Sequence, residues 1–186
     1  MRWLKKSTAS DPLAVSMSGV KLGDRVLVLG GADPKLIAGV AAKAGLTGRA
    51  CAVTPFADES SRVGAAVERE GALVEMHTAP YGALPFPAES FDLVVARDVL
   101  HTQPSGERPG TVHEISRVLR PGGRLMVIET QRPGGIAGLF AGRGGDDDYT
   151  RNGGAVAELS KEGFAGARVL AERGRIAFVE GVKRNV

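Results

Sequence analysis

Two short apolar runs constrain the fold of this chain more than any other feature. A polar loop, a helical stretch and a Pro-Gly-Gly turn join them. The first run is Phe91 to Ala96, and the second is Gly123 to Ile128. Near-continuous apolar strands that alternate with amphipathic helices are typical of a parallel sheet covered on both faces. Residues 86–129 therefore predict one half of a Rossmann-like α/β fold.

Further strands and helices are predicted on both sides of this region. Asp33 is a good helix cap and Pro34 a favoured first residue, so a helix is expected over residues 34–44. Helices are also predicted at 60–70 and 155–161, and strands at 25–29, 49–53, 72–76, 168–172 and 175–180. Residues 131–154 are rich in glycine and are predicted to form a loop or lid. We expect an N-terminal arm over residues 1–19 and one domain over residues 20–186.

Composition narrows the class of protein. With 186 residues and 43% hydrophobic content, the chain can bury a core as one soluble domain, and its net charge of +3 gives little support to nucleic-acid binding. The single cysteine, Cys51, excludes an internal disulfide and predicts a reducing, cytoplasmic location. No apolar run reaches the ~20 residues of a membrane span, so no integral membrane contact is expected. Trp3 lies in a basic arm that either packs on the domain or touches an anionic membrane surface.

The segments Phe86-Pro-Ala-Glu-Ser-Phe-Asp-Leu-Val-Val-Ala-Arg-Asp-Val-Leu-His101 and Glu114-Ile-Ser-Arg-Val-Leu-Arg-Pro-Gly-Gly-Arg-Leu-Met-Val-Ile-Glu129 closely resemble the class I S-adenosylmethionine-dependent methyltransferases. The likeness is strongest to their small-molecule branch, which includes the ubiquinone/menaquinone methyltransferases, and it extends over residues 20–183. It implies a Rossmann-like fold with a central, mostly parallel seven-stranded sheet, an antiparallel last strand and helices on both faces. It also implies S-adenosylmethionine as cofactor and a small-molecule acceptor.

The resemblance implies a set of cofactor-binding residues at the carboxyl ends of the strands, where ligands of open α/β sheets bind. These are Leu29, Gly30, Gly31, Ala32, Thr54, Pro55, Tyr81, Ala83, Leu84, Arg97 and Asp98. The chain departs from the family at several of its polar positions. Asp33 and Pro34 bring a negative charge and remove an N–H where the helix start would face the cofactor. Thr54 follows the second strand where the family has an acid, and Val28 replaces another acid.

His101 is the candidate catalytic residue, because it follows the fourth strand at the floor of the family's pocket. It acts as a base or orients the acceptor, or else it caps or packs the start of the following helix while Asp98 holds Arg97. Glu129 either lines the same pocket or is a solvated strand end.

No metal site is predicted from the sequence. His77 and His113 show neither the spacing nor the neighbours of one, and Cys51 is interpreted as core filler. The aspartates 146–148 either bind a hard cation or belong to a solvated loop.

Three functions from different classes remain open at this point. The first is a small-molecule methyltransferase, with a groove at Gly30, Thr54, Leu84 and Arg97. The second is a methyltransferase-like pseudoenzyme that serves as a binding or scaffolding module, with a homo-oligomer or another protein as partner. The third is a nicotinamide-binding domain, for which the G-x-G-x-x-G spacing fails after Gly31.

Overall fold

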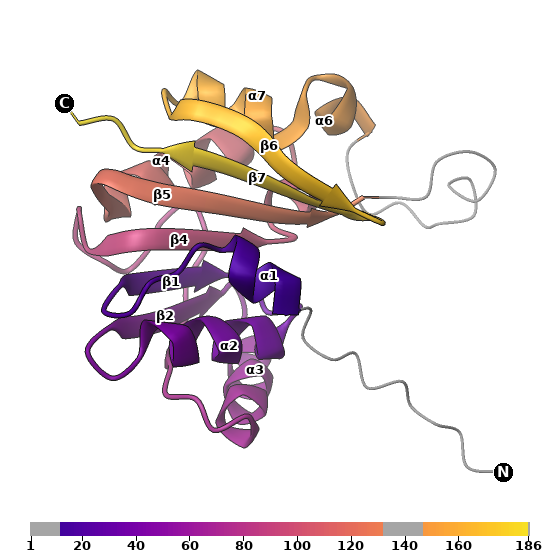
Figure 1. Ribbon diagram of the computed structural model, residues 1–186. Coiled ribbons are helices and arrows are strands. Elements are labelled where there is room, and N and C mark those ends of the chain that lie inside the picture. Colours follow the sequence, from indigo (N-terminus) through magenta and orange to yellow (C-terminus); the bar gives the residue numbers. More distant parts are fainter. Residues whose placement is uncertain (1–11, 132–146, 186) are drawn as a thin grey trace, which may run out of the picture.

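The computed structural model describes residues 12–131 and 147–185, and a seven-stranded sheet runs through them (Figure 1). The strands lie in the order β3-β2-β1-β4-β5-β7-β6. The pairs among β1 to β5 are parallel, whereas β7 is antiparallel to both of its neighbours. The strands are β1 Arg25–Leu29, β2 Arg49–Thr54, β3 Glu75–Thr78, β4 Phe91–Arg97, β5 Leu119–Thr130, β6 Ala165–Arg173 and β7 Ile176–Val182. The predicted mostly parallel sheet with an antiparallel last strand is confirmed.

Helices cover both faces of the sheet, as predicted. On one face, apolar side chains of α1, α2 and α3 form a core with β1, β2 and β4. On the other face, α4 packs against β5, and α7 packs against β6 and β7. The helical elements are α1 Pro12–Met17, α2 Pro34–Ala44, α3 Ala57–Arg69, the 3₁₀ turn η1 Leu100–Thr102, α4 Arg108–Val118, α6 Asp147–Arg151 and α7 Gly154–Lys161. Within residues 12–131 and 147–185, no helix is long and apolar enough to span a bilayer.

Some predicted boundaries are wrong, each for a local reason. The third strand begins at Glu75 rather than residue 72, because the Ala72 N–H still bonds the Val67 carbonyl of α3 after a left-handed Gly71. Helix α3 begins three residues early, at Ala57, with Asp58 and Glu59 in its first turn, where acidic side chains favour a helix start.

The Pro-Gly-Gly segment also differs from its prediction as a turn before a strand. It lies inside β5, where the register with β4 jumps from Phe91↔Leu119 to Leu93↔Arg124. The segment is therefore a bulge in a longer strand, which bends β5 without ending its pairing.

The N-terminal arm and the predicted lid are each helical in part. Pro12–Met17 forms α1, whose Ala14 is buried in the core, and Asp147–Arg151 forms α6. Trp3 lies outside the described residues, as do residues 132–146. The loop prediction is therefore wrong for residues 147–151 and stays a prediction for the segment before them.

Candidate functional site

The loop after β1 is folded tightly against the end of β4. Gly30 has φ +99°, and a Cβ placed on it would collide with the carbonyl oxygen of Arg97. Its N–H donates to the carbonyl of Val53 at the end of β2. Only glycine fits this position, because a side chain would be both strained and blocked. Gly30 thus joins the carboxyl ends of three strands at one place.

The side chain of Asp33 occupies the N-terminus of α2. Asp33 caps the helix, and its carboxylate accepts a hydrogen bond of 3.0 Å from the Leu36 N–H, as predicted. Pro34 has no N–H to offer. The helix start therefore presents a negative charge, and an anionic group of a ligand must find its partner elsewhere.

A carboxylate from α3 lies over the glycine loop. A Cβ placed on Gly31 would be 2.6 Å from Oε1 of Glu59, which is half-buried. Tyr81 lies near the same carboxylate: burial, and then the negative charge of Glu59, raise the pKa of Tyr81. Thr54 is fully buried, and its hydroxyl donates to the Phe56 carbonyl at 3.3 Å. Glu59, five residues beyond the end of β2, therefore faces the glycine loop after β1. The Thr54 hydroxyl is already bonded to the Phe56 carbonyl.

Arg97 and Asp98 end β4 with a strained turn. Asp98 has φ +54°, a left-handed conformation that costs of order 1–3 kcal/mol in a residue other than glycine. The Thr130 backbone N–H donates to Asp98 Oδ1 at 2.6 Å, and the Thr130 hydroxyl donates to Oδ2 at 3.1 Å. Arg97 Nε lies 3.4 Å from Asp98 Oδ2. Two bonds from the next strand therefore hold Asp98 in place without the help of Arg97.

The guanidinium of Arg97 is poorly satisfied. Its side chain is 13% exposed, yet its Nε and Nη1 are buried without a hydrogen-bond partner in the part of the chain that the structure describes. Buried donors left unpaired cost free energy, and they are often explained by an absent ligand. Arg97 lines a hollow of about 450 Å³ together with Ala32, Asp33 and Asp98. An anionic group in this hollow would lie beside the Arg97 side chain, which carries those donors.

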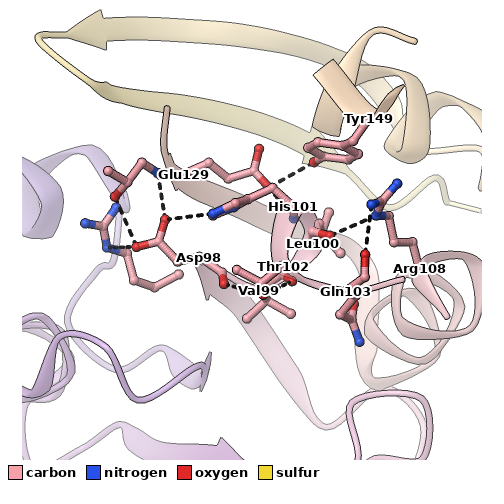
Figure 2. Close-up of polar contacts among 11 residues, drawn as sticks. Asp98, Val99, Leu100, His101, Thr102, Gln103, Arg108, Glu129 and Tyr149 are labelled. Atoms are coloured by element: carbon pink, nitrogen blue, oxygen red, sulfur yellow. Dashed lines mark hydrogen bonds and ion pairs between the residues drawn. The ribbon is translucent and has the colours of Figure 1, made fainter. Parts of the chain in front are cut away.

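His101 lies between two carboxylates at the ends of β4 and β5 (Figure 2). Its Nδ1 is 3.5 Å from Glu129 Oε1, its Nε2 is 3.9 Å from Asp98 Oδ1, and its backbone N–H donates to Glu129 at 3.2 Å. Nδ1 is buried and lacks a hydrogen-bond partner within the described ranges. The ring is therefore oriented by charge, and its nitrogens are not used up by hydrogen bonds of the core.

Tyr149 of α6 closes this cluster from the other side. Its hydroxyl donates to Glu129 Oε1 at 2.9 Å, and its side chain is 4% exposed. Burial, and then the charge of Glu129, raise the pKa of Tyr149, so the phenol stays protonated. Arg108 lies over the ring at 4.5 Å and donates to the carbonyls of Leu100 and Gln103, as Figure 2 shows. Glu129 is thus part of a buried network and not a solvated strand end.

The predicted site residues are only partly brought together. Ala32, Arg97 and Asp98 line one hollow, and Gly30 packs behind it. Leu84 is buried, and its N–H and C=O are bonded by Glu114 and Arg117 of α4. Leu29 is likewise a fully buried core residue, whereas Pro55 is half-buried and Ala83 is exposed.

Sequence reasoning missed two functional candidates and misjudged a third residue. It missed Glu59 because the acid lies in the first turn of the following helix, six residues past the expected strand end. It missed Tyr149 because the segment was predicted to be a loop. The acid-rich start of α3 was a signal for the first. His77, predicted to lack metal-binding neighbours, lies within 4.8 Å of ligating atoms of Cys51 and Glu75.

Comparisons with known proteins agree with this fold. A family model described as a methyltransferase domain matches residues 31–127. The ubiquinone/menaquinone biosynthesis C-methyltransferase UbiE of Hydrogenovibrio crunogenus is 34% identical over 119 residues, which cover 62% of this chain and 46% of that protein. The chain thus spans about half the length of the curated relatives it matches.

Solved structures show the same architecture. A SAM dependent methyltransferase from Aquifex aeolicus aligns with a TM-score of 0.70 at 20% identity, over 94% of this chain and 90% of that one. PigF with SAH aligns with a TM-score of 0.67 at 17% identity, over 91% of this chain and 54% of that one. At these identities the structures show the fold alone.

Proposed function

Because this chain belongs to the methyltransferase domain family, we propose that it transfers a methyl group from S-adenosylmethionine to a small-molecule acceptor in the cytoplasm. The observation that carries the proposal is the pair of charged side chains at the carboxyl edge of the sheet. Arg97 offers buried donors that have no hydrogen-bond partner within residues 12–131 and 147–185, and Glu59 offers a carboxylate over the glycine loop. These are the two kinds of group that the amino-acid end and the ribose of such a cofactor require.

The cofactor, when bound, supplies a methyl group on a positively charged sulfur, and this chemistry depends mainly on proximity and in-line approach. The task of the protein is therefore to hold two ligands in a fixed relation. Gly30 allows the loop to approach the end of β4, and the hollow beside Arg97 lies at that approach. The residues present fit the cofactor, although they are not all at the positions where the family places them.

Arg97 takes over the role of the helix start. A carboxylate cannot be held at the N-terminus of α2, because Asp33 occupies it and Pro34 lacks an N–H. The guanidinium of Arg97 lines the same hollow and has free donors among the described residues. Arginine binds carboxylates through paired, charge-assisted hydrogen bonds. We assign Arg97 to the carboxylate of the cofactor.

Glu59 takes over the role of the missing acid after β2. Thr54 donates its hydroxyl to a backbone carbonyl, so it is a weak substitute for a carboxylate. Glu59 lies over Gly31, in the loop that resembles the family's cofactor loop, with Tyr81 nearby. A carboxylate accepts hydrogen bonds from both hydroxyls of a ribose. We assign Glu59 to the ribose and Tyr81 to the adjoining base.

His101 serves the acceptor. The relatives are named as C-methyltransferases, and a ring carbon that gains a methyl group must lose a proton. A general base must lie within reach of that proton, and a positioned histidine is the commonest choice. Glu129 and Asp98 orient the His101 ring, and the Tyr149 phenol holds Glu129. We assign His101 to deprotonation of the acceptor.

Calorimetric titration of the full chain with S-adenosylmethionine and with S-adenosylhomocysteine (SAH) tests the proposal. We expect binding to both, and a weaker SAH affinity in Glu59→Gln by roughly tenfold or more. Asp58→Asn is the matched control, since Asp58 is an exposed acid in the same turn of α3. A folded protein that binds neither ligand would refute the proposal and favour the pseudoenzyme. SAH release with a panel of phenolic and quinol acceptors would then test the transfer itself.

A further inference from the structure

Three side chains of metal-ligand type converge at the paired strands β2 and β3, away from the site described above. Cys51 and Glu75 are register partners, and His77 follows two residues later, on the same face of the sheet. Cys51 Sγ and His77 Nε2 lie 3.8 and 3.9 Å from Glu75 Oε2, and all three atoms lie within 4.8 Å of one another. The sheet register thus brings together one sulfur, one nitrogen and one oxygen.

We propose that Cys51, Glu75 and His77 bind a divalent transition-metal ion, with Zn²⁺ as the best chemical match. Zn²⁺ binds sulfur at about 2.3 Å and nitrogen or oxygen at about 2.0 Å, so tetrahedral ligand atoms lie about 3.3–3.8 Å apart. With one sulfur in the set, the ideal separations are about 3.5 Å for a pair with sulfur and about 3.3 Å for the nitrogen–oxygen pair. The observed sulfur–oxygen distance of 3.8 Å is therefore about 0.3 Å too long and the nitrogen–oxygen distance of 3.9 Å about 0.6 Å too long. The sulfur–nitrogen distance, at most 4.8 Å, is too long by no more than about 1.3 Å. Small side-chain rotations close that gap without moving the strands.

His77 has a buried ring nitrogen that could bind such an ion. His77 Nε2 is buried and makes no hydrogen bond within residues 12–131 and 147–185. The ring packs edge-on against Phe86, with centroids 4.8 Å apart and planes at 76°, which fixes its orientation. A buried ring nitrogen without a partner is costly, and a metal ion is one ligand that relieves the cost.

Arg49 is the one positive group that the structure records against this cluster, and its position is compatible with an ion. Its Nε donates to Glu75 Oε1 at 2.9 Å and its Nη2 to Oε2 at 2.6 Å. Both side chains are about half exposed, and exposed ion pairs of this kind contribute little stability. Oε2 can therefore turn to the metal while Oε1 keeps its bond to Arg49, which would orient the carboxylate as an outer partner.

The sulfur, nitrogen and oxygen ligands of this cluster determine which metal ions it can bind. One thiolate and one imidazole favour a borderline ion over Mg²⁺ or Ca²⁺, which require oxygen ligands. Binding transfers the thiol proton to solvent, as metal binding to cysteine does. Three protein ligands leave a fourth position for water. An ion here would join the edge strand β3 to β2, and it would stabilise the folded protein by mass action.

The test uses the untagged full chain and Co²⁺ as a spectroscopic probe, followed by competition with Zn²⁺. We expect one Co²⁺ per chain, an ultraviolet charge-transfer band from the cobalt–thiolate bond, and its loss on addition of Zn²⁺. Glu75→Gln and His77→Gln should each weaken Zn²⁺ binding by about tenfold or more, and Cys51→Ser should abolish the thiolate band. His113→Gln is the matched control, because His113 is an exposed histidine paired only with Glu162 among its recorded contacts.

Two results would overturn the proposal. One is the absence of a thiolate band in the folded wild-type protein at excess Co²⁺. The other is metal binding that Glu75→Gln and His77→Gln leave unchanged, which would place the ion elsewhere. Glu75 and His77 are not fully buried, so these variants keep the test valid even if Cys51→Ser fails to fold. A rise in the melting temperature of the wild type with Zn²⁺, absent in Glu75→Gln, would be an independent confirmation.

Discussion

Replacement of Arg97 by methionine should weaken cofactor binding while leaving the stability of the protein nearly unchanged. Methionine keeps the apolar stem and removes the guanidinium. In the free protein this group makes a 3.4 Å ion pair with Asp98, and its Nε and Nη1 lack hydrogen bonds within the described residues. Asp98 retains two hydrogen bonds from Thr130. We therefore expect the free energy of unfolding of Arg97→Met to stay within about 1 kcal/mol of the wild type.

The effect on the cofactor should be much larger. A hydrogen bond to a charged partner is typically worth about 1.5–3 kcal/mol. Its loss corresponds to a roughly 10- to 150-fold rise in the Kd for SAH. The assay is calorimetric titration, paired with urea unfolding of the same sample. Arg173→Met is the control, since it removes the same charge from an exposed residue of β6.

A second ligand makes the assignment specific. Methylthioadenosine keeps the adenosine and lacks the amino-acid end, so Arg97→Met should bind it as well as the wild type does. The reasoning fails if Arg97→Met binds SAH with unchanged affinity, or if it weakens both ligands equally. It also fails if the variant loses several kcal/mol of stability, because the guanidinium would then be a structural group.

Further predictions concern the same edge of the sheet and its support. His101→Gln should lower kcat by about 10²- to 10⁴-fold while SAH affinity in calorimetry stays the same, and a lower affinity would instead make His101 a cofactor residue. Gly30→Ala should destabilise the protein by about 2 kcal/mol or more in urea unfolding, because its φ is +99° and the Arg97 carbonyl blocks the Cβ; a neutral result would contradict the packing. Asp92→Asn should cost about 2 kcal/mol at neutral pH by the same assay, because Asp92 accepts hydrogen bonds from the side chains of Arg25 and Arg120. Burial raises the pKa of Asp92, but these bonds hold it well below its usual value, so the stabilisation is present above about pH 4 and is lost as pH falls; a variant effect that persists in acid would refute this.

The sequence predicted the centre of the sheet well and its edges less well. The runs that became β1 and β4 are apolar along most of their length and bounded by turn residues, so the short apolar runs identified them. The edge strand β3 has no fully buried residue, and its start depends on the left-handed turn at Gly71 that follows α3. Edge strands carry a weaker pattern, because only part of their surface meets the core.

The site was predictable in its location and only partly in its groups. Parallel topology places the ends of β1, β2 and β4 together, so Gly30 and Arg97 were foreseeable. The lack of hydrogen-bond partners for Arg97 Nε and Nη1 among the described residues was not foreseeable, because whether a buried donor finds an acceptor depends on how the side chains pack. Glu59 reaches the loop from a helix, and the Cys51–His77 cluster depends on sheet register; neither relation can be read from spacing along the chain.

The position of β1 has a consequence for how the chain folds. β1 lies beside β4 in the sheet, and the Arg25 N–H bonds Asp92, 67 residues later. At a synthesis rate of about 5–20 residues per second, β4 is synthesised roughly 3–13 s after β1. During that time one edge of β1 is open to any extended chain, and such non-local pairing is slow to form. Protection of the nascent N-terminal half, by a chaperone or by early docking of α2, would then decide the yield of folded protein.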